Sequence, residues 1–182
     1  MKIQFNECKA LVIGGGAIGL LCALILEKIK KCGELYLTEP NEKRLKTCSD
    51  NLESNSIRPE ELNTKENSFD LVFDTVGLEV TRQSAIKYVK PGGTVIHIGL
   101  TQPSGSLDFR KVTLQEITFI GTYCYTNKDF ENTIKILANK EIGNLGWTPS
   151  RRAFHSAGSG PPYGGSLVAS AVGRCGRQNK IP

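Results

Sequence analysis

The 182-residue sequence is poor in the residues that usually build metal sites. It has two histidines, His97 and His155, and none of its six cysteines has a partner at C-x-x-C spacing. We therefore expect no zinc site in this chain. No secretory signal with a small-residue cleavage site precedes the first motifs, so we expect reduced thiols and a cytoplasmic location.

Acidic residues are missing from positions 148–182. The sequence has 23 Lys/Arg and 18 Asp/Glu, and five of the basic residues but none of the acidic ones follow Trp147. The same segment holds six glycines, five serines and four prolines, a composition that buries little apolar surface. We predict an irregular or disordered tail there, and a reading-frame change after Trp147 would make it non-native sequence.

Two partner classes are not expected. The basic residues of positions 148–182 do not form a stripe with interleaved aromatic residues. This argues against nucleic-acid binding. The uncharged stretch Ala10–Leu26 has 17 residues, whereas a membrane span needs about 20. Three glycines divide it into a β-branched part and a leucine-rich part, which predicts a buried strand, a tight turn and a buried helix, and no membrane segment.

Strand-like and helix-like stretches alternate over residues 1–147, which we take as one domain. The alternation predicts an α/β fold, a Rossmann-type doubly wound parallel sheet with helices on both faces. Strands are expected at Lys9–Ile13, Glu34–Thr38, Phe69–Asp74, Thr94–Gly99 and Ile117–Thr122, with a minimal extra strand at Ile57.

Helices are expected between these strands. The first covers Ala17–Ile29, and the second begins at Pro40. Pro91-Gly92-Gly93 should end the third helix, and capping-box spacing between Thr126 and Asp129 should begin the last. The inward residues are expected to be Leu45, Cys48 and Leu52 in the second helix, Val80, Ser84, Ala85, Tyr88 and Val89 in the third, and Phe130, Ile134 and Leu137 in the last.

Gly14, Gly16 and Gly19 form a G-x-G-x-x-G motif between the first predicted strand and helix. Gly14 permits the sharp turn, Gly16 lets a pyrophosphate approach the backbone, and Gly19 lets the helix lie close to the strand. Amide groups at the helix N-terminus would then face the phosphates, where the helix dipole also favours negative charge.

Glu39 lies 20 positions after Gly19, at the end of the second strand. A carboxylate there is expected to accept hydrogen bonds from the adenosine ribose and to repel a 2′-phosphate, so NAD is favoured over NADP. Arg44 would either pair with Glu39, cover the adenosine, or remain a solvated helix residue. Paired with a 2′-phosphate, it would weaken the preference for NAD.

Five ordered motifs together resemble the coenzyme domain of medium-chain, zinc-type alcohol, sorbitol and threonine dehydrogenases. They are ALVIGGGAIGLL, YLTEPNEKRL, DLVFDTVG, VKPGGTVIHIGL and LQEITFIGTYCYT, within residues 7–147. The resemblance implies that Ile117–Thr122 pairs with its copy in a homodimer. The cofactor-binding residues it implies are Gly14, Gly15, Gly16, Ala17, Ile18 and Gly19 at the pyrophosphate, Glu39 and Arg44 at the adenosine, and Thr75, Val76, Gly77, Ile98, Gly99 and Leu100 along the cleft and nicotinamide.

Members of that family carry a preceding β-rich domain that holds the catalytic zinc, and this sequence begins almost at the coenzyme domain. We therefore expect NAD binding without alcohol turnover by this chain alone, no catalytic residue within it, and His97 as a packed side chain. Two alternatives remain open. One is a self-standing, non-catalytic NAD-binding module, and the other, less favoured, is an S-adenosylmethionine-dependent methyltransferase, which also uses a glycine-rich turn and an acidic residue after its second strand.

Overall fold

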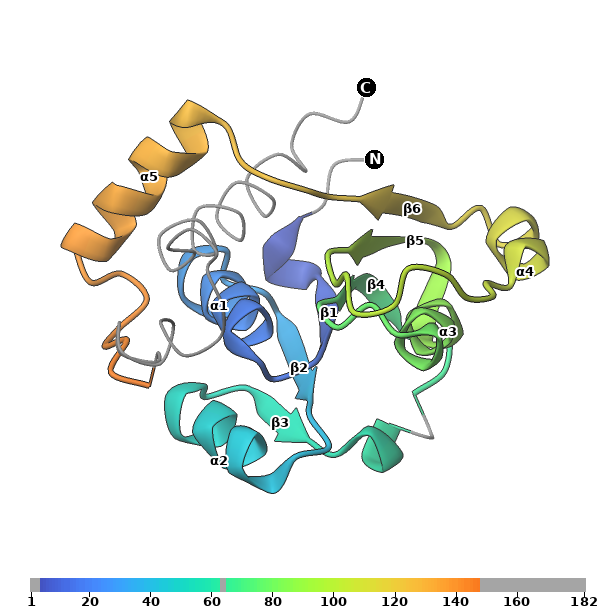
Figure 1. The fold of residues 1–182 in the computed structure, drawn as a ribbon, viewed down its shortest axis with the longest axis horizontal. Helices are drawn as coiled ribbons and strands as arrows, with labels where there is room; N and C mark the ends of the chain where they lie inside the picture. Colours follow the sequence, from blue (N-terminus) through green and yellow to red (C-terminus); the bar gives the residue numbers. More distant parts are fainter. Residues whose placement is uncertain (1–3, 63–64, 148–182) are drawn as a thin grey trace.

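The fold centres on one sheet of six parallel strands in the order β3-β2-β1-β4-β5-β6 (Figure 1). The structure is a computed structural model that describes residues 4–62 and 65–147. The expectations for residues 148–182, including His155, lie outside this range. The strands are β1 (Lys9–Ile13), β2 (Glu34–Thr38), β3 (Asn55–Ile57), β4 (Phe69–Asp74), β5 (Val89–His97) and β6 (Thr118–Gly121).

Helices connect the strands and cover both faces of the sheet (Figure 1). Short 3-10 segments, η1 (Phe5–Glu7) and η3 (Pro59–Leu62), precede β1 and follow β3. The longer helical segments are α1 (Ala17–Leu24), its π-helical continuation η2 (Ile25–Ile29), α2 (Glu42–Asn51), α3 (Glu79–Tyr88), α4 (Phe109–Leu114) and α5 (Asn127–Ala138).

Each face of the sheet has its own apolar core. Residues of α1, η2, α2 and α5 pack with Leu37, Leu71 and Phe73 on one face. Residues of α3 and α4 pack with Val72 and Val95 on the other. Burying one such side chain stabilises the fold by about 1.5–3 kcal/mol. The two apolar cores therefore hold the ends of the strands in place.

The predicted α/β class and parallel sheet are confirmed, and the predicted bounds of β1, β2 and β4 agree with the structure. The stretch Ala10–Leu26 is divided among β1, the glycine turn, α1 and the start of η2. Among the described residues, no helix combines the length and the apolar character needed to cross a bilayer. The segment around Ile57, predicted as a minimal extra strand, forms β3 beside β2.

Several predicted boundaries are wrong. The helix before Pro91 ends at Tyr88, and β5 already pairs with β4 at Val89, so Pro91-Gly92-Gly93 lies inside the strand. Proline has no N–H to donate and Gly92 adopts φ +71°, and the register shifts there before pairing resumes at Thr94. The strand then ends at His97. The last strand is also shorter than Ile117–Thr122, since β6 covers Thr118–Gly121.

Some predicted core positions are wrong as well. Val80 is 62% exposed, because α3 faces the sheet with Ala85, Ile86 and Tyr88. In α5 the capping box is present, but Phe130 and Ile134 are exposed. Leu137 packs against the core as predicted, and Thr133 and Ile136 face the core in place of the other two. Phe130 and Ile134 are therefore apolar side chains that the core of the described residues does not cover.

Gly19 is the tightest point of contact between α1 and the sheet. A Cβ there would overlap the carbonyl oxygen of Gly14 and lie 2.8 Å from the Thr75 hydroxyl. We predict that Gly19→Ala lowers the free energy of unfolding by about 3 kcal/mol, since backbone rather than a flexible side chain must move. Urea denaturation would measure it.

Gly16→Ala is the matched control. No atom lies within 4 Å of a Cβ at Gly16, whose φ is −70°. Alanine is a poorer N-cap than glycine, so we expect a loss of at most about 1 kcal/mol. Equal losses for the two variants would contradict the close approach at Gly19.

Candidate functional site

The candidate site lies at the carboxyl edge of the sheet, where β1, β2, β4 and β5 end. The chain leaves β1 toward β2 and β3 on one side, and returns to β4 and β5 on the other. In open parallel sheets ligands bind outside the strand ends at such a reversal of strand order. The glycine turn follows β1, and Glu39 and Thr75 follow β2 and β4 directly.

The glycine turn is held between two strand ends. Gly14 adopts φ +101°, which favours glycine, and its N–H donates to the carbonyl oxygen of Thr38, at 2.8 Å. On the other side, Thr75 donates through its hydroxyl to the carbonyl oxygen of Ile13, also at 2.8 Å. A Cβ on Gly14 would lie 2.5 Å from a methyl group of Val76. The turn therefore has one conformation, set by β2 and β4 together.

The N-terminus of α1 begins at this turn. Gly16 is the N-cap residue, and no side chain among the described residues caps the first turn of the helix. Space is open where a Gly16 Cβ would lie. The first amides of a helix have no intrahelical acceptor, and the helix dipole adds positive potential there. Ala17 and Ile18 thus present backbone donors to an anionic group beside an uncrowded glycine.

Glu39 is a buried carboxylate, only 2% exposed. One oxygen accepts from the Gly15 N–H at 2.8 Å. The other accepts from the Asn41 N–H and from the Arg44 guanidinium, each at 2.9 Å. A carboxylate can accept about four hydrogen bonds, so capacity remains for a ligand hydroxyl. Glu39 therefore joins the end of β2 to the glycine turn.

Arg44 and Cys48 approach Glu39 from α2. Arg44 pairs with Glu39, yet its side chain is 58% exposed. Cys48 lies beneath Gly15, and its thiol donates to the Gly15 carbonyl oxygen at 3.6 Å. Burial and the nearby Glu39 carboxylate raise the pKa of the Cys48 thiol to about 12. Cys48 is thus a neutral packing group, and Arg44 is the cation beside this acid.

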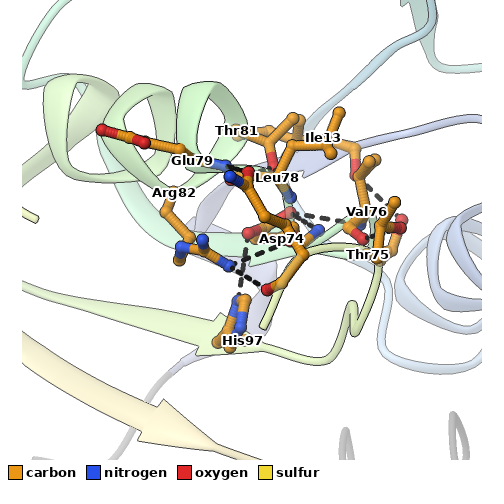
Figure 2. Close-up of polar contacts among 12 residues, drawn as sticks. Ile13, Asp74, Thr75, Val76, Leu78, Glu79, Thr81, Arg82 and His97 are labelled. Carbon is orange, nitrogen blue, oxygen red and sulfur yellow. Dashed lines mark hydrogen bonds and ion pairs between the residues drawn. The ribbon is translucent and has the colours of Figure 1, made fainter. Parts of the chain in front are cut away.

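Asp74, the last residue of β4, holds together the turns after β4 and β5 (Figure 2). Its side chain is fully buried, and one carboxylate oxygen accepts from the backbone N–H groups of Val76 and Gly77, at 3.1 and 2.9 Å. Its backbone carbonyl accepts from the N–H groups of Ile98 and Gly99, at 2.9 and 3.1 Å. One residue therefore fixes four amides from two strand ends.

The turns after β4 and β5 also touch directly. A Cβ on Gly77 would overlap the Gly99 carbonyl group, and a Cβ on Gly99 would overlap the backbone of Val76. Arg82 of α3 donates to the carbonyl oxygens of Gly77 and Ser104, which ties the segment after β5 to the same turn. Leu100, beyond this contact, is 73% exposed.

The structure brings the residues singled out from the sequence to one edge, but it divides them into two groups. Gly14–Gly19, Glu39 and Arg44 form one hydrogen-bonded group. Thr75, Val76, Gly77, Ile98 and Gly99 form the other, and Thr75 joins the two through Ile13.

Sequence reasoning missed Asp74 and Arg82 as parts of the site. For Asp74 a signal was present: the acidic residue that ends the apolar run FDLVFD is followed three residues later by Gly77, which adopts a positive φ in the structure. His97 was expected to be a packed side chain. It is partly buried against Phe119 and also donates through Nδ1 to Asp74 at 3.0 Å (Figure 2).

A metal centre does not form from the described residues, because no three of their His, Cys, Asp or Glu side chains lie close enough together to hold an ion. The residues of this chain that the structure describes therefore do not fit a zinc ion, and no chemical step is assigned to one.

Solved structures of known proteins share this fold. Acetophenone reductase from Geotrichum candidum, solved in complex with NAD, superposes with a TM-score of 0.69 at 22% identity. The match covers 77% of this chain and 40% of that one.

Curated relatives match the same region. (R,R)-butanediol dehydrogenase of Saccharomyces cerevisiae is 27% identical over 146 residues, which are 73% of this chain and 37% of that protein. Sorbitol dehydrogenase 1 of the same yeast is 20% identical, over 90% of this chain and 51% of its own length. The chain thus spans about a third to a half of the length of these relatives.

A family model described as "Zinc-binding dehydrogenase" matches residues 17–139, about two thirds of the chain. The match begins at the N-terminus of α1 and ends just after α5, so it covers most of the parallel sheet and the residues that follow β2, β4 and β5. The same match argues against the alternative of an S-adenosylmethionine-dependent methyltransferase. The chain therefore belongs to the zinc-binding dehydrogenase family, and it contains that family's coenzyme-binding region.

Proposed function

We propose that the chain binds NAD along the carboxyl edge of its sheet, as the coenzyme-binding part of an NAD-dependent alcohol or polyol dehydrogenase. The observation that carries the proposal is the hydrogen bond from the Gly15 N–H to the buried Glu39 carboxylate. That contact supports the proposal because it sets a carboxylate, which could accept from a ribose hydroxyl, beside an open glycine at a helix N-terminus.

The order of the strands gives the direction of the cofactor. Glu39 after β2 would accept from the adenosine ribose, and Gly14 to Gly19 after β1 would hold the pyrophosphate. The nicotinamide half would then extend over the ends of β4 and β5, along Thr75, Val76, Gly77, Ile98, Gly99 and Leu100. The exposed side chain of Leu100 adds apolar surface at that end.

NAD, when bound, supplies the hydride acceptor for oxidation of an alcohol. The described residues bind it and fix its orientation through backbone amides. The alcohol and polyol substrates in this proposal are inferred from relatives named for butanediol and sorbitol. The activity of a longer protein that contains this region is part of the same proposal.

The preference for NAD over NADP follows from the same carboxylate. A 2′-phosphate would approach Glu39, and two anions in a partly buried site repel each other. Arg44 softens this repulsion, because its guanidinium already pairs with Glu39 and is 58% exposed. We infer that NAD is preferred over NADP and that Arg44 determines the strength of this preference.

A cytoplasmic location is inferred from the thiols, because no disulfide joins the cysteines of the described part of the chain. The division of the chain at residue 147, into a binding domain and a separate tail, is also part of the proposal.

Gly16→Ala should abolish most NAD binding while the fold persists. The added methyl group would fill the open space at the helix N-terminus that the pyrophosphate needs. We expect NAD affinity to fall at least about tenfold, which is about 1.4 kcal/mol, as measured by isothermal titration calorimetry. Unchanged affinity would mean that the pyrophosphate does not bind here.

Glu39→Gln should reduce the preference for NAD over NADP. The amide can no longer accept at both positions, and the loss of a charged hydrogen bond of about 1.5–3 kcal/mol predicts about ten- to hundredfold weaker NAD binding. NADP binding should weaken less, since its repulsion is also removed. The matched control is Glu42→Gln, an acid on the first turn of α2 that is 79% exposed and pairs with Arg58. An equal effect of both substitutions would count against the proposal.

A homodimer through Ile117–Thr122 is the remaining proposal. Strand β6 lies at the end of the sheet, so one side of it has no neighbouring strand among the described residues. Such an edge can add a second strand, and Phe109 and Leu114 of the adjacent α4 are exposed and apolar. Light scattering should give twice the 19.9 kDa chain mass. A constant single-chain mass up to high micromolar concentration would refute the dimer.

A further inference from the structure

Asp74 is a buried acidic residue whose carboxylate is held by few side chains. Its side chain is fully buried, and its only ion-pair partner among the described residues is His97. Burying a carboxylate costs free energy unless hydrogen bonds or an opposite charge compensate it. Two backbone amides contact one oxygen, and the imidazole contacts the other, at 3.0 Å. His97 is therefore the side chain that holds this carboxylate in place.

His97 connects three strand ends. Its ring contacts Asp74 of β4 on one side and lies beside Phe119 of β6, with ring centroids 5.7 Å apart. Its backbone carbonyl accepts from the Thr122 N–H, at 3.0 Å, where the chain leaves β6. Figure 2 shows the ring directed at the Asp74 carboxylate from the end of β5. A change of this side chain is thus transmitted to the turns after β4 and β5, and to the end of β6.

These turns lie on one side of the cleft. Glu39 and the glycine turn lie over β2 and β1, whereas Asp74 and His97 lie over β4 and β5. One carboxylate oxygen of Asp74 accepts from the amides of Val76 and Gly77. The backbone carbonyl of Asp74 accepts from the amides of Ile98 and Gly99. None of these amides belongs to the proposed adenosine end. Loss of the His97 contact should therefore act on one half of the cofactor only.

We propose that Asp74 and His97 are a positioning pair for the nicotinamide half of the bound dinucleotide. In this pair the imidazole orients the carboxylate, and the carboxylate orients the turn after β4, which lies against the turn after β5 at Gly77 and Gly99. The inference rests on the proposed binding of NAD, and it adds which residues control one end of the site. Neither side chain is assigned a proton transfer. The pair acts through the backbone of the turns.

The test compares two ligands, NAD and ADP-ribose, which has the adenosine diphosphate and second ribose but no nicotinamide. Affinities of the full chain are measured by isothermal titration calorimetry for wild type and His97→Leu. We expect NAD affinity to fall about tenfold in the variant, about 1.4 kcal/mol, and ADP-ribose affinity to stay within about twofold. If His97 had only a structural role, the affinities for both ligands would fall equally.

His97→Asn is the matched control, because its side-chain amide can donate to Asp74 from nearly the position of Nδ1. We expect it to bind both ligands within about twofold of wild type. Circular dichroism checks folding, and if His97→Leu does not fold, His97→Phe keeps a ring beside Phe119 and gives the same comparison.

The following results would overturn the inference. Equal losses for NAD and ADP-ribose, or no loss for either, would show that the pair does not act on the nicotinamide half. A failure of His97→Asn to restore NAD affinity would show that the hydrogen bond is not the cause. If wild type bound neither ligand, the proposed function itself would fail, whereas binding of both ligands with equal affinity by wild type would refute only the positioning pair.

Discussion

The hydrogen bond between the Gly15 N–H and the buried Glu39 carboxylate is the contact on which the proposed adenosine end of the site depends. A hydrogen bond to a charged group contributes about 1.5–3 kcal/mol, and here it joins two segments 24 residues apart in the sequence. It fixes the glycine turn relative to the end of β2. The Gly14 N–H to Thr38 contact supports the same placement through the backbone. A turn that is already held in this way loses little conformational entropy when a diphosphate binds.

The two ends of the cleft use the same physical arrangement. Glu39 directly follows β2 and accepts from two backbone amides and the Arg44 guanidinium. Asp74 ends β4 and accepts from two backbone amides and the His97 imidazole. In each case a buried carboxylate after an apolar strand fixes the turns around it. A parallel sheet covered on both faces leaves its carboxyl edge as the place where such polar groups can meet.

Sequence alone was sufficient where one local rule decides the structure. Alternation of apolar strands and helices predicted the bounds of β1, β2 and β4, and glycine spacing predicted the turn around Gly14. Prediction from sequence failed where a segment distant in the chain determines the local structure. The π-helical segment η2 within the predicted first helix has no local marker, and β5 begins early because Val89 pairs with Phe69. The exposure of Phe130 and the contact of His97 with Asp74 likewise depend on tertiary packing.

The partners of the two carboxylates differ in exposure, and this difference separates their effects on binding. Arg44 is 58% exposed, so it can move toward a ligand phosphate while Glu39 keeps its backbone donors. His97 is 19% exposed and lies beside Phe119, so it cannot leave Asp74 without disturbing the ends of β4, β5 and β6. If the chain binds NAD as proposed, the adenosine end is the adaptable half, where cofactor preference can change through one exposed side chain. The other end would be the rigid half, and rigidity there would suit hydride transfer, because a misplacement of about 1 Å can cost about a hundredfold in rate.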